Sequence, residues 1–227
     1  MLHVYAITDS AQHPEATGLD GADLRTVGER APFAVVSEHA QLSPQVSEED
    51  LWAHEKVVEE LMDRASVLPM RFDGTVADEV ALRRILGQRR EEFEALLAAV
   101  RGAVELGVRA QLAEEREEEE VLEGVGPNVA GSVGPGTAYL LARARNQRRA
   151  VDLTTRLHEP LAALSRSSRR SGAGLRPGLF KAAYLVDRDR VDAFRARVDV
   201  LDSELGSGGI VCTGPWPPYS FSSEEPG

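Results

Sequence analysis

The sequence predicts an α+β fold made of two ferredoxin-like domains, residues 1–104 and 105–227, each a small, mainly antiparallel sheet covered by helices. Both halves interleave segments of strand-like alternation with segments of helical period. The length of 227 residues suits two small domains. The hydrophobic fraction of 42% can supply a core for each of them.

The first domain is expected to begin with three strands. Over residues 2–7, Leu2, Val4 and Ala6 alternate with His3, Tyr5 and Ile7, which is the period of a strand. Residues 9–21 are rich in turn-forming residues, and two short β-like runs follow at 24–28 and 33–37. This order predicts a small sheet before the first helix.

The first helix is the strongest element of the sequence. Ser47 is a natural N-cap, and the acidic residues after it occupy the first turn, where the helix dipole favours negative charge. His54 is followed by Glu55, but Val58 stands where a His-Glu-x-x-His zinc motif needs its second histidine, so we expect His54 to be a buried or half-buried core residue. The expected buried stripe comprises Leu51, His54, Val58, Leu61 and Ala65.

The remaining elements follow from the same patterns. Residues 67–72 predict a short strand, and 76–104 predict a helix in two pieces with Gly87 between them. Residues 165–177 are expected to be loop. The second domain is expected to contain a strand from Leu106, a long helix from about Thr137 with Pro160 as a point for a kink, and a strand over 180–186. A helix from Val191 to Leu205 and a last strand that opens with 210–212 are expected to follow.

Two segments of the second domain have unusual composition. Residues 114–136 begin with an acidic run and continue rich in Gly, Pro and Asn, which predicts a mobile loop. The chain closes with Thr213-Gly-Pro-Trp-Pro-Pro-Tyr-Ser-Phe221. Its rings either form part of a protein-contact surface or cap the C-terminal core, and Trp52 beside the helix stripe has the same two interpretations. The candidate contact residues are Trp216, Tyr219, Phe221 and Trp52.

Charge and cysteine content exclude several classes of partner. The formal net charge is −11, from 37 acidic and 26 basic residues, so we expect neither nucleic acid nor a membrane surface as a partner. No apolar run approaches the ~20 residues of a membrane span. A lone cysteine, Cys212, predicts a buried thiol in a reducing compartment, and the start lacks signal-peptide features, so we expect a cytoplasmic protein.

The motifs of catalysis are missing from the sequence. It contains no glycine-rich phosphate loop and no Gly-x-Ser-x-Gly nucleophile elbow. Its five histidines lack metal-ligand spacing, and the acidic run lacks the turn residues of a calcium loop. We therefore expect no catalytic residue, no cofactor and no metal, and predict that the protein is not an enzyme.

Four segments carry a resemblance to a known family. They are the helix Leu51-Trp-Ala-His-Glu-Lys-Val-Val-Glu-Glu-Leu61, the run Val67-Leu-Pro-Met-Arg-Phe72, the run Pro135-Gly-Thr-Ala-Tyr-Leu-Leu141 and the closing segment 213–221. In this order and spacing they resemble the gas vesicle protein F/L family. The resemblance extends from the first strand to Phe221, and the closing segment is its most specific part. Residues 114–136 match no family element.

The resemblance implies a two-domain accessory protein of gas vesicle formation, without cofactor or catalytic residue. Its partners would be the small, very hydrophobic shell protein and other vesicle accessory proteins, and its location the cytoplasm and the gas vesicle. An assembly factor and a minor structural component of the finished shell are both compatible with this, as is self-association. An unrelated small-molecule-binding or catalytic α+β protein is the remaining alternative. The resemblance does not distinguish the role of protein F from the role of protein L within the family.

Overall fold

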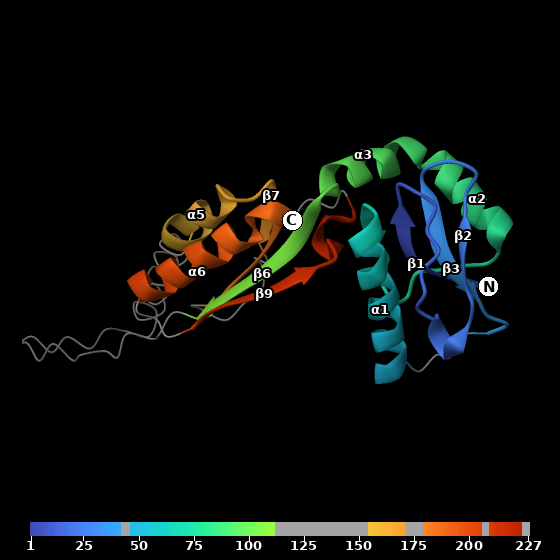
Figure 1. Cartoon of the computed structure of the whole chain (residues 1–227), viewed down its shortest axis with the longest axis horizontal. Helices are drawn as coiled ribbons and strands as arrows, with labels where there is room; N and C mark the ends of the chain where they lie inside the picture. The colour runs from blue at the N-terminus through green and yellow to red at the C-terminus, as the bar shows by residue number, and fades with distance from the viewer. Residues whose placement is uncertain (42–45, 112–153, 171–178, 206–208, 224–227) are drawn as a thin grey trace, which may run out of the picture. The chain divides into compact units, whose positions relative to one another are not determined.

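The structure, a computed structural model, describes residues 1–41, 46–111, 154–170, 179–205 and 209–223 (Figure 1). It contains two antiparallel sheets with packed helices, which confirms the α+β class. The predicted loop 114–136 and the predicted start of a long helix at Thr137 lie outside the described residues.

The chain forms two compact units. The first holds residues 1–106, 185–191 and the closing segment from Thr213, and the second holds the rest of the described residues. The chain therefore leaves the first unit after Leu106 and returns to it twice. The closing segment, which the sequence analysis assigned to the second domain, lies in the first unit. The division into domains 1–104 and 105–227 stays a prediction.

The first unit is built on a sheet with the strand order β2-β3-β1-β4, and β5 also pairs with β1. The pairs of β1 with β3, β4 and β5, and of β2 with β3, are antiparallel. A bulge interrupts the β1–β3 ladder between Val4 and Ala6. Its strands are β1 (Leu2–Thr8), β2 (Leu24–Val27), β3 (Phe33–Glu38), β4 (Val67–Pro69) and β5 (Thr75–Val76).

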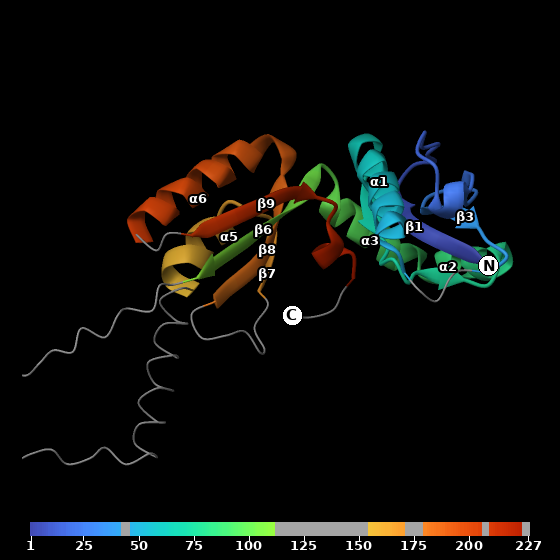
Figure 2. The same cartoon turned by 90° about the horizontal axis from the view of Figure 1, so that it is seen from below.

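Every residue of β1 is buried, because helices cover both faces of this sheet. Helix α1 lies on one side of β1 and α2 on the other (Figure 2). The helices are α1 (Glu48–Arg64), α2 (Glu79–Gln88) and α3 (Arg90–Val100).

Helix α1 begins at the predicted cap but buries a different set of residues. The Ser47 hydroxyl accepts a hydrogen bond from Asp50 N, and the Asp50 carboxylate accepts one from Ser47 N, each 3.1 Å long, which is a capping box. The prediction that Leu51 is buried was wrong: it stands in the first turn, where burial depends on what packs against the helix end and not on the period. The buried residues are His54, Val57, Val58, Leu61 and Met62.

Helices α2 and α3 separate at Arg89, not at the predicted Gly87. Gly87 is an internal residue of α2, whereas Arg89 has φ −105° and ψ 21° and serves both helices as a cap. A helical glycine costs only about 1 kcal/mol, so it does not by itself end a helix. The helical pattern also ends earlier than predicted, because Val104 belongs to the following strand.

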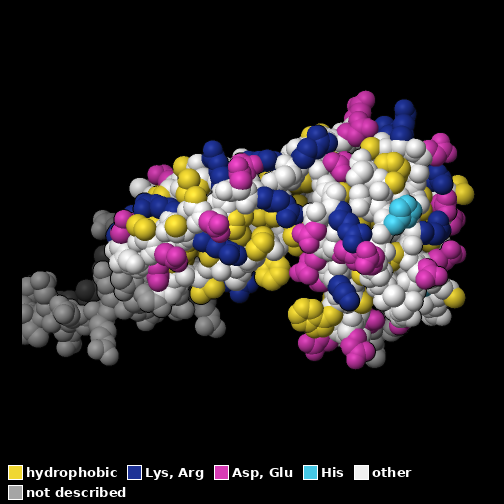
Figure 3. Space-filling model, viewed as in Figure 1, with side chains coloured by type: hydrophobic (Ala, Val, Ile, Leu, Met, Phe, Trp, Pro, Cys, Tyr) yellow, Lys and Arg dark blue, Asp and Glu magenta, His cyan; other side chains and the backbone are white. Residues whose placement is uncertain are grey.

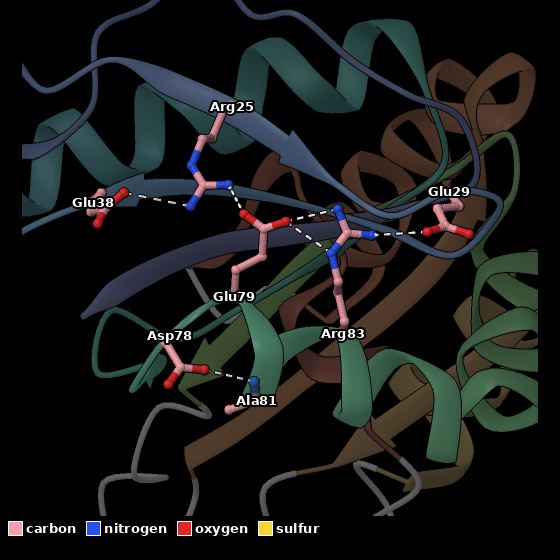
Figure 4. Close-up of polar contacts among 7 residues, drawn as sticks. All are labelled: Arg25, Glu29, Glu38, Asp78, Glu79, Ala81 and Arg83. Atoms are coloured by element: carbon pink, nitrogen blue, oxygen red, sulfur yellow. Dashed lines mark hydrogen bonds and ion pairs between the residues drawn. The ribbon is translucent and has the colours of Figure 1, made fainter.

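The start of α2 is tied to the edge of the sheet by ion pairs (Figure 4). Asp78 caps the helix by accepting a 2.8 Å hydrogen bond from Ala81 N. Glu79 accepts hydrogen bonds from Arg25 of β2 and from Arg83 one helical turn later. These bonds lower the pKa of Glu79. The contacts account for the position of α2 beside β2.

The sheet that β6 begins has the order β7-β8-β6-β9. Strand β7 corrects the prediction of a loop over 165–177, because Ser167–Arg170 are polar edge-strand residues without hydrophobic alternation. Strand β9 opens at Ile210, as predicted, and continues to Trp216. The elements are β6 (Ala103–Gln111), a π-helical turn (Thr154–His158), α5 (Glu159–Ala162), β7 (Ser167–Arg170), β8 (Leu179–Asp187), α6 (Val191–Leu205) and β9 (Ile210–Trp216).

The two sheets share one strand order. When the first four strands of each sheet are numbered along the chain, both read 2-3-1-4. In the second sheet α5 precedes the second strand and α6 precedes the fourth, which fits the split β-α-β arrangement of ferredoxin-like folds. In the first sheet only a 3-10 turn, Leu19–Gly21, stands in the first crossover. The two halves are thus similar in topology without a sequence repeat.

Candidate protein-contact surface

The two tryptophans of the chain are both exposed. Trp52 on α1 is 68% exposed and Trp216 at the end of β9 is 46% exposed. Single exposed apolar residues are common on proteins, but an indole ring is the largest apolar surface a side chain can offer to a partner. Both rings belong to the first unit. They are the starting point for a contact surface.

Trp216 is carried on a segment that is fastened to α1. Three residues later, the Tyr219 hydroxyl donates a 2.9 Å hydrogen bond to Glu55 Oε1. Burial, and then the neighbouring Glu55 carboxylate, raise the pKa of Tyr219, so the phenol keeps its proton and remains the donor. Burial also raises the pKa of Glu55, and the bond from Tyr219 opposes that shift.

A second attachment holds the same segment to β6. Ser220 N and Ser220 Oγ donate to the two carboxylate oxygens of Glu105, and both distances are 2.7 Å. Phe221 is buried beneath this attachment, with 6% of its surface exposed. The closing segment is therefore anchored at three consecutive residues, and Trp216 projects from an ordered backbone.

The close approach of β9 to β6 requires glycine at position 214. Gly214 has φ +108°, a conformation that side-chain-bearing residues rarely adopt. A Cβ added there would lie 2.7 Å from the backbone oxygen of Glu105 and 3.1 Å from the Leu106 side chain. The close contact between Gly214 and Glu105 therefore fixes the position of the end of β9, which carries Trp216.

The four predicted contact residues thus separate into three roles. Trp52 and Trp216 are exposed, Tyr219 is half-buried and hydrogen-bonded, and Phe221 belongs to the core. The structure brings Tyr219 to α1, where Trp52 precedes Glu55 by one helical turn. The two anchoring carboxylates, of Glu55 and Glu105, were not predicted, because each is more than a hundred residues from its partner in the sequence.

The surface around Trp52 is acidic. The indole nitrogen Nε1 lies 3.4 Å from Glu48 Oε1, at hydrogen-bonding distance. Glu48, Glu49 and Glu59 are exposed on the same helix, and they outnumber the exposed cation Lys56, which follows Trp52 by one turn. Figure 3 shows hydrophobic side chains in yellow next to acidic side chains in magenta on the face it presents. An apolar ring with carboxylates around it suits a partner that is both apolar and cationic.

A buried histidine pair lies under α1 and belongs to the core. His54 Nε2 is 2.9 Å from the Met70 carbonyl oxygen, so it carries the proton and donates. His54 Nδ1 is then an acceptor, and His3 Nε2 donates to it over 2.8 Å. His3 Nδ1 is left without a hydrogen-bond partner among the described residues. Burial, then the nearby His54 and His39, lower the pKa of His3 to about 4, so both rings are neutral.

Other reactive groups do not form a site. Among the described residues, no group of three His, Cys, Asp or Glu side chains is placed to hold a metal ion. Cys212, predicted to be buried, is half-buried, and burial raises the pKa of its thiol, which disfavours the reactive thiolate. An open hollow at the end of α1 contains Arg101 and Arg188, but each lies near an aspartate carboxylate, that of Asp9 or Asp63.

No helix in the described part of the chain is long and apolar enough to cross a membrane. The fold and the surface define an α+β protein with two exposed tryptophans, Trp52 among the acidic residues of α1 and Trp216 on the anchored closing segment. Within that class, the chain belongs to the gas vesicle synthesis protein GvpL/GvpF family, whose family profile matches residues 1–223. The family resemblance of the sequence is thereby confirmed.

Individual relatives agree over nearly the full length. Gas vesicle protein F of Streptomyces sp. strain CB03234 is 31% identical, over 96% of this chain and 98% of its own. Gas vesicle protein F1 of Halobacterium salinarum is 27% identical, over 97% and 92%. The crystal structure of GvpF from Anabaena sp. PCC7120 superposes with a TM-score of 0.79 at 20% identity, over 99% of this chain and 96% of that one. This last likeness shows the fold.

Proposed function

We propose that this chain is a non-catalytic accessory protein of gas vesicle formation, which binds the hydrophobic shell protein and other vesicle proteins during assembly. It would act in the cytoplasm and at the gas vesicle. Membership of the GvpL/GvpF family supports the process, and the two exposed, anchored tryptophans support binding as the activity. The single observation that carries the proposal is the exposure of Trp52 and Trp216 beside the Tyr219–Glu55 bond.

A hydrophobic shell protein needs a binding partner to stay soluble before assembly. A very hydrophobic shell subunit made in water aggregates through exposed strand edges and apolar patches. A partner that covers those patches with its own aromatic rings removes them from water. The formal charge of −11 on this chain then keeps complexes apart by repulsion.

The anchoring of the closing segment favours tight contact. A tryptophan on a mobile tail must be ordered when it binds, which costs about 0.5–1.5 kcal/mol for each side chain that is immobilised. Trp216 is instead the last residue of β9 and precedes two buried prolines, Pro217 and Pro218, and the hydrogen-bonded Tyr219. Its backbone is ordered before a partner arrives.

Binding of purified shell protein to the immobilised full chain tests the proposal. The double variant Trp52→Ala, Trp216→Ala should lose most of the binding, about tenfold or more in Kd, as for tryptophan hot spots elsewhere. The matched control is Val80→Ala, since Val80 is an exposed apolar residue of α2, on the other side of the sheet. No binding of shell protein to the folded wild-type chain would disprove the function.

A urea wash of purified vesicles separates an assembly factor from a shell component. Complete loss of the chain from washed vesicles is expected of an assembly factor. Retention with the shell would instead support the alternative, a minor structural component incorporated in the vesicle.

A further inference from the structure

We infer that the first turns of α1 form a docking surface for a cationic amphipathic helix of a protein partner. This surface, the α1 docking surface, comprises Val46, Leu51, Trp52, Glu48 and Glu49. The inference rests on the proposed function, because it names the part of a vesicle protein that this surface takes. Local structure, exposure and charge each support it.

The backbone of this surface is ordered by local interactions. The capping box of Ser47 and Asp50 closes the first turn of α1. Val46, just before the cap, and Leu51, four residues into the helix, occupy the two positions of a hydrophobic staple. The staple explains why position 51 carries an apolar residue, although Val46 and Leu51 both remain about half-exposed.

Trp52 has no such local explanation. It follows the staple position and leaves 68% of its surface exposed, with one polar contact, to the Glu48 carboxylate. Together with Val46 and Leu51 it makes an apolar patch at one end of α1. A tryptophan in such a patch is the residue type most often found at the centre of a protein interface.

The charge of the patch selects the partner. The helix N-terminus carries about half a positive charge, but Glu48, Glu49 and Asp50 outweigh it. The hydrogen bonds from Ser47 lower the pKa of Asp50, which keeps that carboxylate ionised in the cap. Glu48 and Glu49 remain for a partner, so lysine or arginine side chains beside an apolar face would pair with them and stack on the indole ring.

The same charges disfavour other occupants. An anionic lipid surface would be repelled by the glutamates. A second copy of this chain would bring the same acidic face against itself in a two-fold contact. A helix with leucine-like residues on one face and lysine or arginine at the next turn satisfies both the apolar patch and the carboxylates.

The first experiment uses a designed peptide and the full chain. The probe is a synthetic helical peptide with leucine on one face and lysine on the other. In Trp216→Phe, Trp52 is the sole tryptophan, and its emission should shift to shorter wavelength as the peptide covers it. In the matched Trp52→Phe variant, the emission of Trp216 should stay unchanged.

Affinity measurements complete this test. Trp52→Ala should weaken binding of the peptide about tenfold, and the charge-neutral pair Glu48→Gln, Glu49→Gln should weaken it and reduce its salt dependence. Val80→Ala should bind like the wild type. Unchanged Trp52 emission, or equal peptide affinity of Trp52→Ala and wild type, would overturn the inference.

Repeating the measurements with the shell protein separates the inference from the proposed function. If wild type binds the shell protein and the α1 variants bind it equally well, the α1 docking surface is wrong and the function stands. If the peptide covers Trp52 but the shell protein does not bind, the function is wrong and the surface serves a different cationic partner.

Discussion

The Tyr219 hydroxyl and Glu55 Oε1 are 2.9 Å apart and join two points of the chain that are 164 residues distant in sequence. The bond attaches the closing segment to the middle of α1. It also places the segment of Trp216 beside the helix that carries Trp52. The candidate contact surface therefore depends on a long-range polar contact, and its contribution can be measured.

Replacing Tyr219 with Phe should destabilise the first unit by about 1–2 kcal/mol, because a hydrogen bond to a charged group is lost and Glu55 stays half-buried without it. Urea unfolding followed by circular dichroism measures this change. In a double-mutant cycle with Glu55→Gln, the two substitutions should show a coupling energy of at least about 0.5 kcal/mol. Strict additivity would mean that the bond contributes nothing to stability.

Replacing the aromatic rings of the closing segment with alanine should change the stability of the protein by very different amounts. Phe221→Ala should cost about 3–5 kcal/mol in stability, because it opens a cavity in the core. Trp216→Ala should change stability by only about 0.5 kcal/mol and act on partner binding instead. Thermal unfolding of both variants checks the prediction, and a large loss of stability in Trp216→Ala would return that ring to the core.

Two glycines should respond to alanine in opposite directions. Gly214→Ala should destabilise the protein by about 1–3 kcal/mol, because its φ is +108° and the new Cβ would clash with the Glu105 backbone oxygen. Gly87→Ala should stabilise it by about 0.4–1 kcal/mol, because a new Cβ at that helical site would meet no atom within 4 Å outside the adjacent backbone of its own helix. Chemical denaturation of the pair measures both effects, and equal shifts would contradict the close approach of β9 to β6.

The buried histidine pair should make stability depend on pH. The pKa of His3 is about 4 in the folded chain, against an ordinary histidine value of 6.5 in the unfolded chain, so the unfolded chain takes up the proton first as pH falls. Stability is then complete above pH 6.5 and declines toward pH 4, by roughly 2–3 kcal/mol from His3. Urea midpoints between pH 4 and 7 measure the decline.

The matched variants are His3→Gln and His13→Gln. A glutamine amide at position 3 can still donate to His54 Nδ1 but cannot take up a proton, so the share of the decline that His3 causes should disappear. His13 is exposed, and its replacement should leave the profile as it is. An unchanged profile in His3→Gln would mean that His3 is charged or accessible in the folded state.

Elements with strong local signals were predicted well. The Ser47 cap and the helical period located α1, and the patterns over β8 and α6 matched the structure closely. Strand β7 was missed, because the polar run of Ser167–Arg170 carries no alternation, and its place in the sheet comes from pairing with β8. The break at Arg89 was misplaced for a similar reason, since no residue type marks it.

Helix caps, hydrophobic periods and the aromatic-proline motif are local patterns, so they were enough to predict the α+β class, the family and the residue types of the candidate surface. Which of the rings face water depends on contacts between distant parts of the chain. Phe221 is buried and Trp216 is exposed although both belong to one short motif. Their difference follows from Glu55 and Glu105, whose carboxylates are brought to the closing segment from distant parts of the chain, and no local pattern encodes such a meeting.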